Sequence, residues 1–296
     1  MAGLPKKQAT MTIAIYGSRQ QQPYAAQIER ILRHIVLTGT DIEMHPKLYG
    51  HLSELGVSLA GVGQAALSGP GQGCSLVLSI GGDGTFLRTA AWVGRLGIPI
   101  IGINTGHLGY LATMNIDDAS SDNGIDGMLN ADFAIEERTL LEVCSPEVRG
   151  WRYALNEVCI AKDDSVSMIQ ADTFVDGIEL AQYRADGLII ATPTGSTAYN
   201  LSAGGPIVQP TAPVLVVSPI AAHSLGMRPL VIDDHSVLDI NVSGRTRAFR
   251  LSLDGRSTVL PMGSEVRIRR APFVCRIAMR PDSAFPVSLR RKLLFN

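Results

Sequence analysis

Apolar positions in the first 130 residues fall either into short continuous runs or into sets with helical spacing. Three continuous runs predict buried strands: Thr12–Tyr16, Ser75–Ile80 and Ile98–Ile103. Helical spacing from Ile28 to Val36 predicts one helix, and a second is expected over residues 85–96, before Gly97. Strands that alternate with helices predict a parallel α/β sheet with right-handed crossovers.

The pattern changes near residue 130. Short apolar or alternating runs then follow one another with turn residues between them, and few hold a helical period. The runs that predict strands are Thr139–Val143, Glu157–Ala161, Gly187–Ala191, Val214–Val217, Val237–Val242 and Val266–Ile268. We therefore expect an N-terminal, Rossmann-like parallel α/β domain over residues 1–132 and a C-terminal β-rich, sandwich-like domain over residues 133–279. The amphipathic tail Val287–Leu294 predicts a short helix.

The composition excludes several classes of protein. The chain of 296 residues is 46% apolar and 18% charged, with a net charge of −1, so it lacks the basic surface of a nucleic-acid binder. Its four cysteines have no paired spacing for zinc or a disulfide framework. The longest apolar stretch, Val214 to Ala222, is interrupted by Pro219 and is too short to span a membrane. These features predict a cytoplasmic protein without nucleic-acid or membrane partners.

A glycine-rich turn directly follows the strand predicted over Ser75–Ile80. In the sequence Gly81-Gly82-Asp83-Gly84-Thr85, three glycines let the backbone approach a ligand closely. Successive N–H groups in such a turn, next to the start of a helix, favour phosphate. Asp83 introduces a carboxylate where a simple phosphate loop would avoid negative charge. The turn therefore predicts a site that binds phosphate and also handles a proton or a metal ion.

Two further loops are candidates for ligand binding. Asn104 to Tyr110 follows the strand predicted over Ile98–Ile103, so it is expected to converge on the first loop at the same edge of the sheet. The segment Asp186 to Tyr199 ends a strand in hydroxyl residues, proline and glycine, and a helix is expected from Thr197. Hydroxyls and N–H groups at a helix start suit phosphate, ribose or adenine. Asp254-Gly255 reads as a hairpin turn.

Other nucleotide-binding and catalytic motifs are absent or out of context. Gly61 to Ala66 matches a dinucleotide fingerprint, but Gly69-Pro70-Gly71 would end the required helix too early. The chain contains no Walker pattern for a P-loop. Ser196 does not lie in a nucleophile elbow, because Ala198 stands where the second glycine belongs.

Taken in order, several of these segments resemble the bacterial NAD kinase family. The resemblance rests on Gly81–Thr85, Asn156-Glu157, and Asp186–Tyr199 with Gly204-Gly205-Pro206, and also on Gly102–Gly109 and His223–Leu230. It covers roughly residues 75 to 270. The glycine motif alone is shared with diacylglycerol and sphingosine kinases and, loosely, with phosphofructokinases, whereas the block from Asp186 is more specific. The resemblance implies transfer of the terminal phosphate of ATP to the adenosine-ribose 2′-hydroxyl of NAD, giving NADP.

The resemblance also implies roles for individual residues. Asp83 is implied to be the catalytic residue that accepts the 2′-hydroxyl proton, as a positioned carboxylate can. The residues implied to contact ATP or NAD are Gly81, Gly82, Asp83, Gly84, Thr85, Arg88, Asn156, Glu157, Arg184, Asp186, Thr194, Thr197, Ala198, Tyr199, Asn200, Leu201 and Ser202. Arg256 stands where relatives often carry glutamine, so its role stays open.

The remaining implications concern cofactors and assembly. A divalent ion, Mg²⁺ or Mn²⁺, is expected to be held through substrate phosphates, and no residue is assigned as its ligand. The resemblance implies a homo-oligomer, either dimer or tetramer, and a tail (residues 280–296) that packs back on the first domain. Two alternatives remain: a lipid kinase of the same superfamily, and a protein that senses NAD(P) without catalysis.

Overall fold

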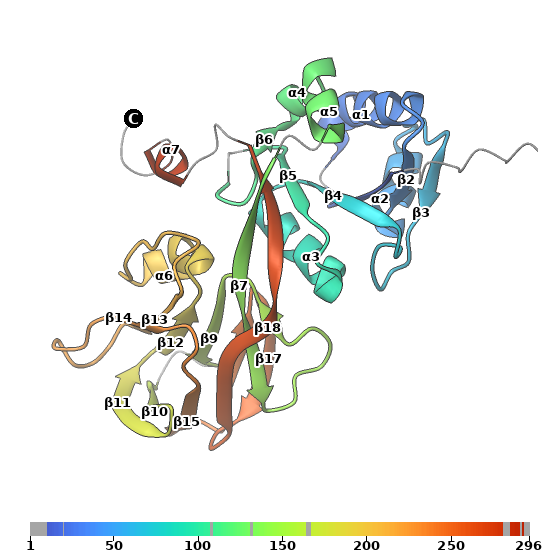
Figure 1. Ribbon diagram of the computed structural model, residues 1–296. Helices are drawn as coiled ribbons and strands as arrows, with labels where there is room; N and C mark the ends of the chain where they lie inside the picture. The colour runs from blue at the N-terminus through green and yellow to red at the C-terminus, as the bar shows by residue number, and fades with distance from the viewer. Residues whose placement is uncertain are drawn as a thin grey trace, which may run out of the picture. The chain divides into compact units, whose positions relative to one another are not determined.

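The computed structural model describes residues 11–19, 21–106, 109–130, 133–163, 167–280, 285–290 and 292. The chain divides into two compact units. Unit 1 comprises Met1–Glu136 and Arg276–Asn296, and unit 2 comprises Glu137–Cys275. Figure 1 shows that the longer helices belong to unit 1, whereas unit 2 consists mainly of strands.

Unit 1 is built on a parallel sheet. Its strands are β1 (Thr12–Gly17), β2 (Asp41–Met44), β3 (Val62–Gln64), β4 (Cys74–Ile80), β5 (Ile100–Asn104) and β6 (Met114–Asn115). The strand order is β5-β4-β1-β2-β3, with β6 and the end of β18 (Glu265–Met279) also pairing with β5. All these pairs are parallel, so the loops after β4 and β5 emerge at the same edge of the sheet.

Helices cover both faces of this sheet. They are α1 (Ala25–Leu37), α2 (Pro46–Glu54), α3 (Asp83–Val93), α4 (Ile116–Ala119) and α5 (Asp122–Leu129), with 3-10 turns η1 (Gln22–Tyr24) and η2 (Gly94–Leu96). Apolar side chains of α1, α2, α4 and α5 share one core with strand residues such as Ile13 and Ile15. Tyr16 points to the other face, where its ring packs against Trp92 of α3. Figure 1 accordingly shows α3 on the opposite side of the sheet from α1.

The expected parallel α/β architecture of unit 1 is confirmed, but both boundaries of one helix were wrong. The helix expected over residues 85–96 begins at Asp83 and ends at Val93, and a separate 3-10 turn follows. Gly82 is extended and serves as the N-cap, so Asp83 occupies the first helical position. Acidic residues are favourable there because of the helix dipole. The tail helix α7 spans Phe285–Leu289, and the rest of its predicted range lies largely outside the described residues.

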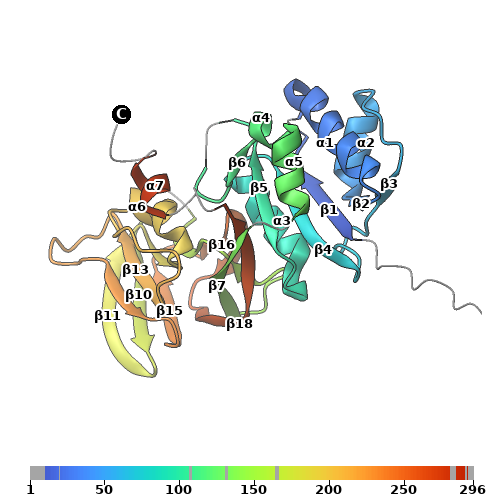
Figure 2. The same ribbon diagram turned by 45° about the horizontal axis from the view of Figure 1, so that its top comes forward.

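Unit 2 contains two antiparallel sheets. One has the order β14-β13-β12-β9-β16-β17. Its strands are β9 (Glu157–Lys162), β12 (Gly187–Ala191), β13 (Val214–Ile220), β14 (Leu230–Asp233), β16 (Ala248–Leu253) and β17 (Arg256–Pro261). The other contains β7 (Ala134–Ser145), β8 (Tyr153–Ala154), β10 (Ile169–Val175), β11 (Ile178–Ala185), β15 (Leu238–Gly244) and β18. Figure 2 gives a second view of these strands.

Buried side chains from both sheets form a single core, which confirms the expected sandwich-like architecture. Leu188 and Leu251 come from one sheet, and Ile240 and Val266 from the other. All four are fully buried. The sequence patterns missed the β10–β11 hairpin, β14, β16 and β17. The helix expected from Thr197 is instead a 3-10 turn, η3 (Thr194–Thr197), followed by the short helix α6 (Tyr199–Ser202).

Candidate active site

The glycine-rich turn of unit 1 lies between β4 and α3. Gly81 has φ +146°, which L side chains rarely adopt, and an added Cβ would lie 2.5 Å from Thr85 Oγ1. Only glycine fits at this position. Gly82 and Gly84 are exposed and have open space where a Cβ would be. The turn thus leaves its backbone accessible at the N-terminus of α3, where N–H groups favour an anion.

The Asp83 carboxylate is held by the loop that follows β5. Its Oδ2 accepts the N–H of Tyr110 at 2.7 Å, and its Oδ1 accepts the N–H of Leu111 at 3.1 Å. A Cβ on Gly109 would collide with this carboxylate, so the preceding glycine is required for the approach. The predicted convergence of the loops after β4 and β5 is therefore confirmed. His107 lies outside the described residues.

Arg88 projects from α3, one turn after Thr85. Its side chain is exposed, and its Nη2 donates to Thr85 Oγ1 at 3.2 Å. Because Thr85 itself is buried against Gly81, this contact ties the guanidinium to the glycine-rich turn. The structure thus brings together all the predicted contact residues of unit 1 on one short segment, Gly81 to Arg88.

In unit 2, Asn156 and Glu157 are held by a residue about 100 positions later in the chain. The Asp254 carboxylate accepts the N–H groups of Leu155 at 2.7 Å, Asn156 at 2.8 Å and Glu157 at 3.3 Å. Asp254 begins the predicted hairpin turn between β16 and β17, with φ +48° at Asp254 and +77° at Gly255. The turn was predicted from the sequence, but the role of its carboxylate was not.

Burial dominates the charge state of the two carboxyl groups in this cluster. It raises the pKa of Glu157 to about 7, and the negative charge of Asp254 acts in the same direction, while the N–H of Tyr199 opposes it. Glu157 Oε2 has no hydrogen-bond partner among the described residues. Burial also raises the pKa of Asp254, against the opposing effect of its three N–H donors. Glu157 is therefore poised to change its protonation near neutral pH.

The role of Arg256 was left open by the sequence. In the structure its guanidinium group binds two backbone carbonyl groups. Its Nη1 donates to the carbonyl of Trp151 at 2.7 Å and its Nη2 to that of Tyr153 at 2.6 Å. Both acceptors precede Asn156 by only a few residues. Arg256 and Asp254 thus fix the same loop from one hairpin, which indicates a positioning role for Arg256.

The block from Arg184 to Ser202 places some predicted residues on the surface. Asp186 forms an ion pair with Lys162 at 2.8 Å, and Arg184 is exposed. Tyr199 keeps 44% of its surface exposed. Ser202 is exposed as well, and Thr197, Ala198 and Leu201 are partly exposed. These side chains are accessible to a ligand.

Two members of the same block are buried and engaged within the protein. Asn200 donates to the carbonyls of Ser196 and Pro206 at 3.1 Å each, and its Oδ1 accepts the Ser218 hydroxyl at 2.7 Å. Thr194 is buried, and its hydroxyl accepts from Arg138 at 3.3 Å. Both arrangements support the fold of the η3–α6 segment. Gly195 belongs to this segment too, since a Cβ there would collide with the carbonyl of Asn156.

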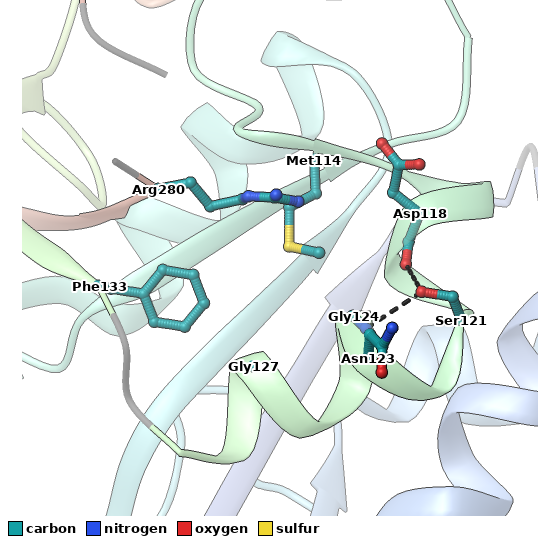
Figure 3. A pocket seen from close by; sticks show the side chains of 8 residues that line it. All are labelled: Met114, Asp118, Ser121, Asn123, Gly124, Gly127, Phe133 and Arg280. Atoms are coloured by element: carbon teal, nitrogen blue, oxygen red, sulfur yellow. Dashed lines mark hydrogen bonds between the residues drawn. The ribbon is translucent and has the colours of Figure 1, made fainter. Parts of the chain in front are cut away.

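Each unit contains a cavity of several hundred Å³. In unit 2, one of about 460 Å³ is lined by Arg184 together with Arg245, Gln170 and Met168, so its walls carry positive charge. In unit 1, another of about 390 Å³ is lined by residues of α4 and α5 with Met114, Phe133 and Arg280 (Figure 3). The second cavity contains none of the residues predicted from the sequence.

Metal-ligating side chains gather at one place among the described residues, and none of these three residues was predicted from the sequence as a site residue. Asp233, Asp234 and His235 offer ligand atoms within 4.8 Å of one another. Asp234 is already paired with Arg270 at 2.9 Å.

No helix in the described part of the chain is long and apolar enough to cross a membrane.

A parallel α/β unit with a glycine-rich turn and a held carboxylate, in one chain with an antiparallel sandwich, is the arrangement of a two-domain enzyme that binds phosphate-bearing ligands. Comparison with known proteins identifies which one. The family model of the ATP-NAD kinase N-terminal domain matches residues 62–130, and that of the ATP-NAD kinase C-terminal domain matches residues 155–278. This chain belongs to the NAD kinase family.

Individual NAD kinases are similar to this chain over nearly its whole length. The NAD kinase of Porphyromonas gingivalis is 41% identical over 298 residues, covering 96% of this chain and 97% of the relative. The crystal structure of yeast NADH kinase complexed with NADH superposes with a TM-score of 0.82 at 23% identity, covering 98% of this chain and 89% of that one. An NAD kinase from Archaeoglobus fulgidus in complex with ATP gives a TM-score of 0.74 at 23% identity, covering 94% and 97%.

Proposed function

We propose that this protein transfers the γ-phosphate of ATP to the adenosine-ribose 2′-hydroxyl of NAD, giving NADP and ADP. The observation that carries the proposal is the Asp83 carboxylate at the start of α3, which accepts the backbone N–H groups of Tyr110 and Leu111 in a chain of the NAD kinase family. A fixed and partly exposed carboxylate at a phosphate-binding turn suits proton abstraction from an alcohol during phosphoryl transfer.

In this proposal Asp83 is the general base. It takes the proton of the 2′-hydroxyl while the hydroxyl oxygen bonds to the γ-phosphorus of ATP. The bond between the γ-phosphorus and the bridging oxygen breaks, and ADP leaves. The N–H groups at the start of α3 and the Arg88 guanidinium stabilise the negative charge on the phosphate oxygens. Gly81 and Gly82 let the phosphates approach the backbone.

We infer that the acceptor NAD is bound in unit 2, by Asn156, Glu157 and the accessible side chains of the segment from Arg184 to Ser202. Asn156 and Glu157 supply an amide and a carboxyl group whose positions are fixed by Asp254. The exposed side chains of Tyr199 and Ser202, with Arg184 and Asp186, offer a ring, a hydroxyl and charges for the adenosine half. The inward hydrogen bonds of Asn200 and Thr194 make them supports of this surface.

The phosphate-binding turn suits a divalent ion that is bound mainly through the phosphates of ATP, and not one held by several protein side chains. The turn presents a single carboxylate, and both of its oxygens already accept N–H groups. Mg²⁺ commonly binds through substrate phosphates and keeps several waters. When bound, Mg²⁺ or Mn²⁺ would neutralise charge on the β- and γ-phosphates.

We further infer a cytoplasmic location and a homo-oligomeric state.

The test is direct. Purified protein supplied with ATP, Mg²⁺ and NAD is expected to form NADP, detected with an NADP-specific dehydrogenase. Diacylglycerol or sphingosine in place of NAD is expected to remain unphosphorylated. Binding of NAD without NADP formation, or phosphorylation of the lipid instead, would contradict the proposal.

A further inference from the structure

The C-terminal segment brings a lysine to the loop that holds Asp83. Lys292 Nζ lies 4.1 Å from the centroid of the Tyr110 ring, a distance typical of a cation–π contact. Tyr110 is also the residue whose backbone N–H donates to Asp83 Oδ2. One residue therefore links the tail cation to the carboxylate, and both contacts lie within unit 1.

The charge on Lys292 is only partly solvated. Its side chain is partly buried, and this burial lowers its pKa from 10.5 to about 8, while the negative charge of Asp83 acts in the opposite direction. The ring beneath it stays neutral over the same range, because burial and Asp83 both raise the pKa of Tyr110. A poorly hydrated ammonium gives up little solvation when it meets an anion, so it binds phosphate more strongly than an exposed lysine does.

A positive charge near Asp83 would favour binding of ATP at the proposed site of phosphoryl transfer, the glycine-rich turn. A carboxylate at a phosphate-binding turn repels the anionic donor, and the sequence has no P-loop lysine to offset this repulsion. Arg88 supplies one positive charge, but its guanidinium is exposed and already donates to Thr85. Lys292 supplies a second positive charge, on the side of Asp83 where the loop after β5 lies.

We propose that Lys292 is a phosphate-binding residue of the transfer site, brought there by the C-terminal segment and held over the Tyr110 ring. Its ammonium pairs with phosphate oxygens of ATP and offsets the charge of Asp83. This inference rests on the proposed NAD kinase activity and adds Lys292 to the phosphate-binding residues that the sequence motifs place at Gly81 to Arg88.

Two substitutions separate charge from shape. Lys292→Met keeps a long unbranched side chain and removes the charge, and Lys292→Arg keeps the charge. We expect Lys292→Met to lower kcat/KM for ATP by about 10- to 100-fold. This decrease corresponds to the free energy lost when one hydrogen bond to a charged group is removed. Lys292→Arg should retain most of the activity. Lys47→Met, at an exposed lysine of α2 in the same unit, is the matched control and should behave as wild type.

The pH profile gives a readout that a merely structural role would not change. In the wild-type enzyme, kcat/KM for ATP is expected to fall as the pH rises through about 8, because the free enzyme then loses the ammonium charge. In Lys292→Arg this fall should disappear, since guanidinium stays protonated. Absence of NADP formation by the wild type would refute the activity itself. Wild-type kcat/KM in Lys292→Met, or equal losses in Lys292→Met and Lys292→Arg, would overturn the role of Lys292.

Discussion

Asp83 in unit 1 and Asp254 in unit 2 make the same kind of contact in different surroundings. Each carboxylate accepts N–H groups from consecutive residues of a distant loop: Tyr110 and Leu111 for Asp83, and Leu155 to Glu157 for Asp254. Asp83 remains partly exposed, whereas the Asp254 side chain is only 5% exposed. The hydrogen bonds fix a loop in both cases, but only the accessible carboxylate can also receive a proton from a substrate.

The comparison predicts its largest effect at Gly109. In Gly109→Ala the new methyl group would collide with the Asp83 carboxylate and displace it from its N–H donors. We expect kcat to fall by at least about 100-fold, the usual contribution of a positioned general base. Gly106→Ala, in the same loop but with open space around its Cβ, is the control and should keep near wild-type kcat. Equal activity in the two variants would show that the position of Asp83 does not matter.

Asp254 is expected to matter first for stability. Asp254→Asn removes the carboxylate that accepts three backbone N–H groups, and an amide oxygen cannot replace both carboxylate oxygens. We expect a loss of about 2–4 kcal/mol in the free energy of unfolding, measured by urea denaturation, with a raised KM for NAD. Asn tolerates the positive φ at this position, so the turn itself is kept.

Asp176 supplies the matched control for that variant. It also opens an Asp-Gly hairpin turn with positive φ, but it is exposed, and among the described residues its side chain accepts only the N–H of Val237. Asp176→Asn is expected to cost less than about 1 kcal/mol. A loss for Asp176→Asn as large as that for Asp254→Asn would mean that burial is not what distinguishes the two carboxylates.

Glu157, which lies beside Asp254, gives unit 2 a measurable dependence of stability on pH. Its pKa rises from 4.5 in the unfolded chain to about 7 in the fold, so the folded protein holds a proton that the unfolded chain releases first. This contribution to stability is present below pH 4.5 and is lost as the pH rises to about 7. Glu157→Gln lacks this loss, so relative to wild type it should gain about 3 kcal/mol between pH 4.5 and pH 8. Urea unfolding at both pH values measures this, and parallel pH dependence in the two proteins would contradict it.

The sequence predicted what is contiguous and missed what is assembled from distant residues. The Gly81 to Thr85 turn was recognisable because its glycines, its carboxylate and the flanking strand adjoin. The contacts of Asp254 with Asn156 and of Lys292 with Tyr110 join residues about 100 and 180 positions apart, and no local pattern marks either pair. Similarly, the family resemblance implied a ligand contact for Asn200, but no local pattern indicated the hydrogen bonds that its amide makes with Ser196 and Ser218.

The role of Asp83 as general base is tested most directly by measuring the turnover of Asp83→Asn together with its affinity for NAD. Asparagine keeps the shape of the side chain but cannot act as a base at neutral pH. We predict that kcat for NADP formation falls by about 100- to 10,000-fold, while the Kd for NAD, measured by calorimetry, stays within about threefold of wild type. A variant that retains wild-type kcat, or that loses activity only because it no longer binds NAD, would contradict the assignment of Asp83 as the general base.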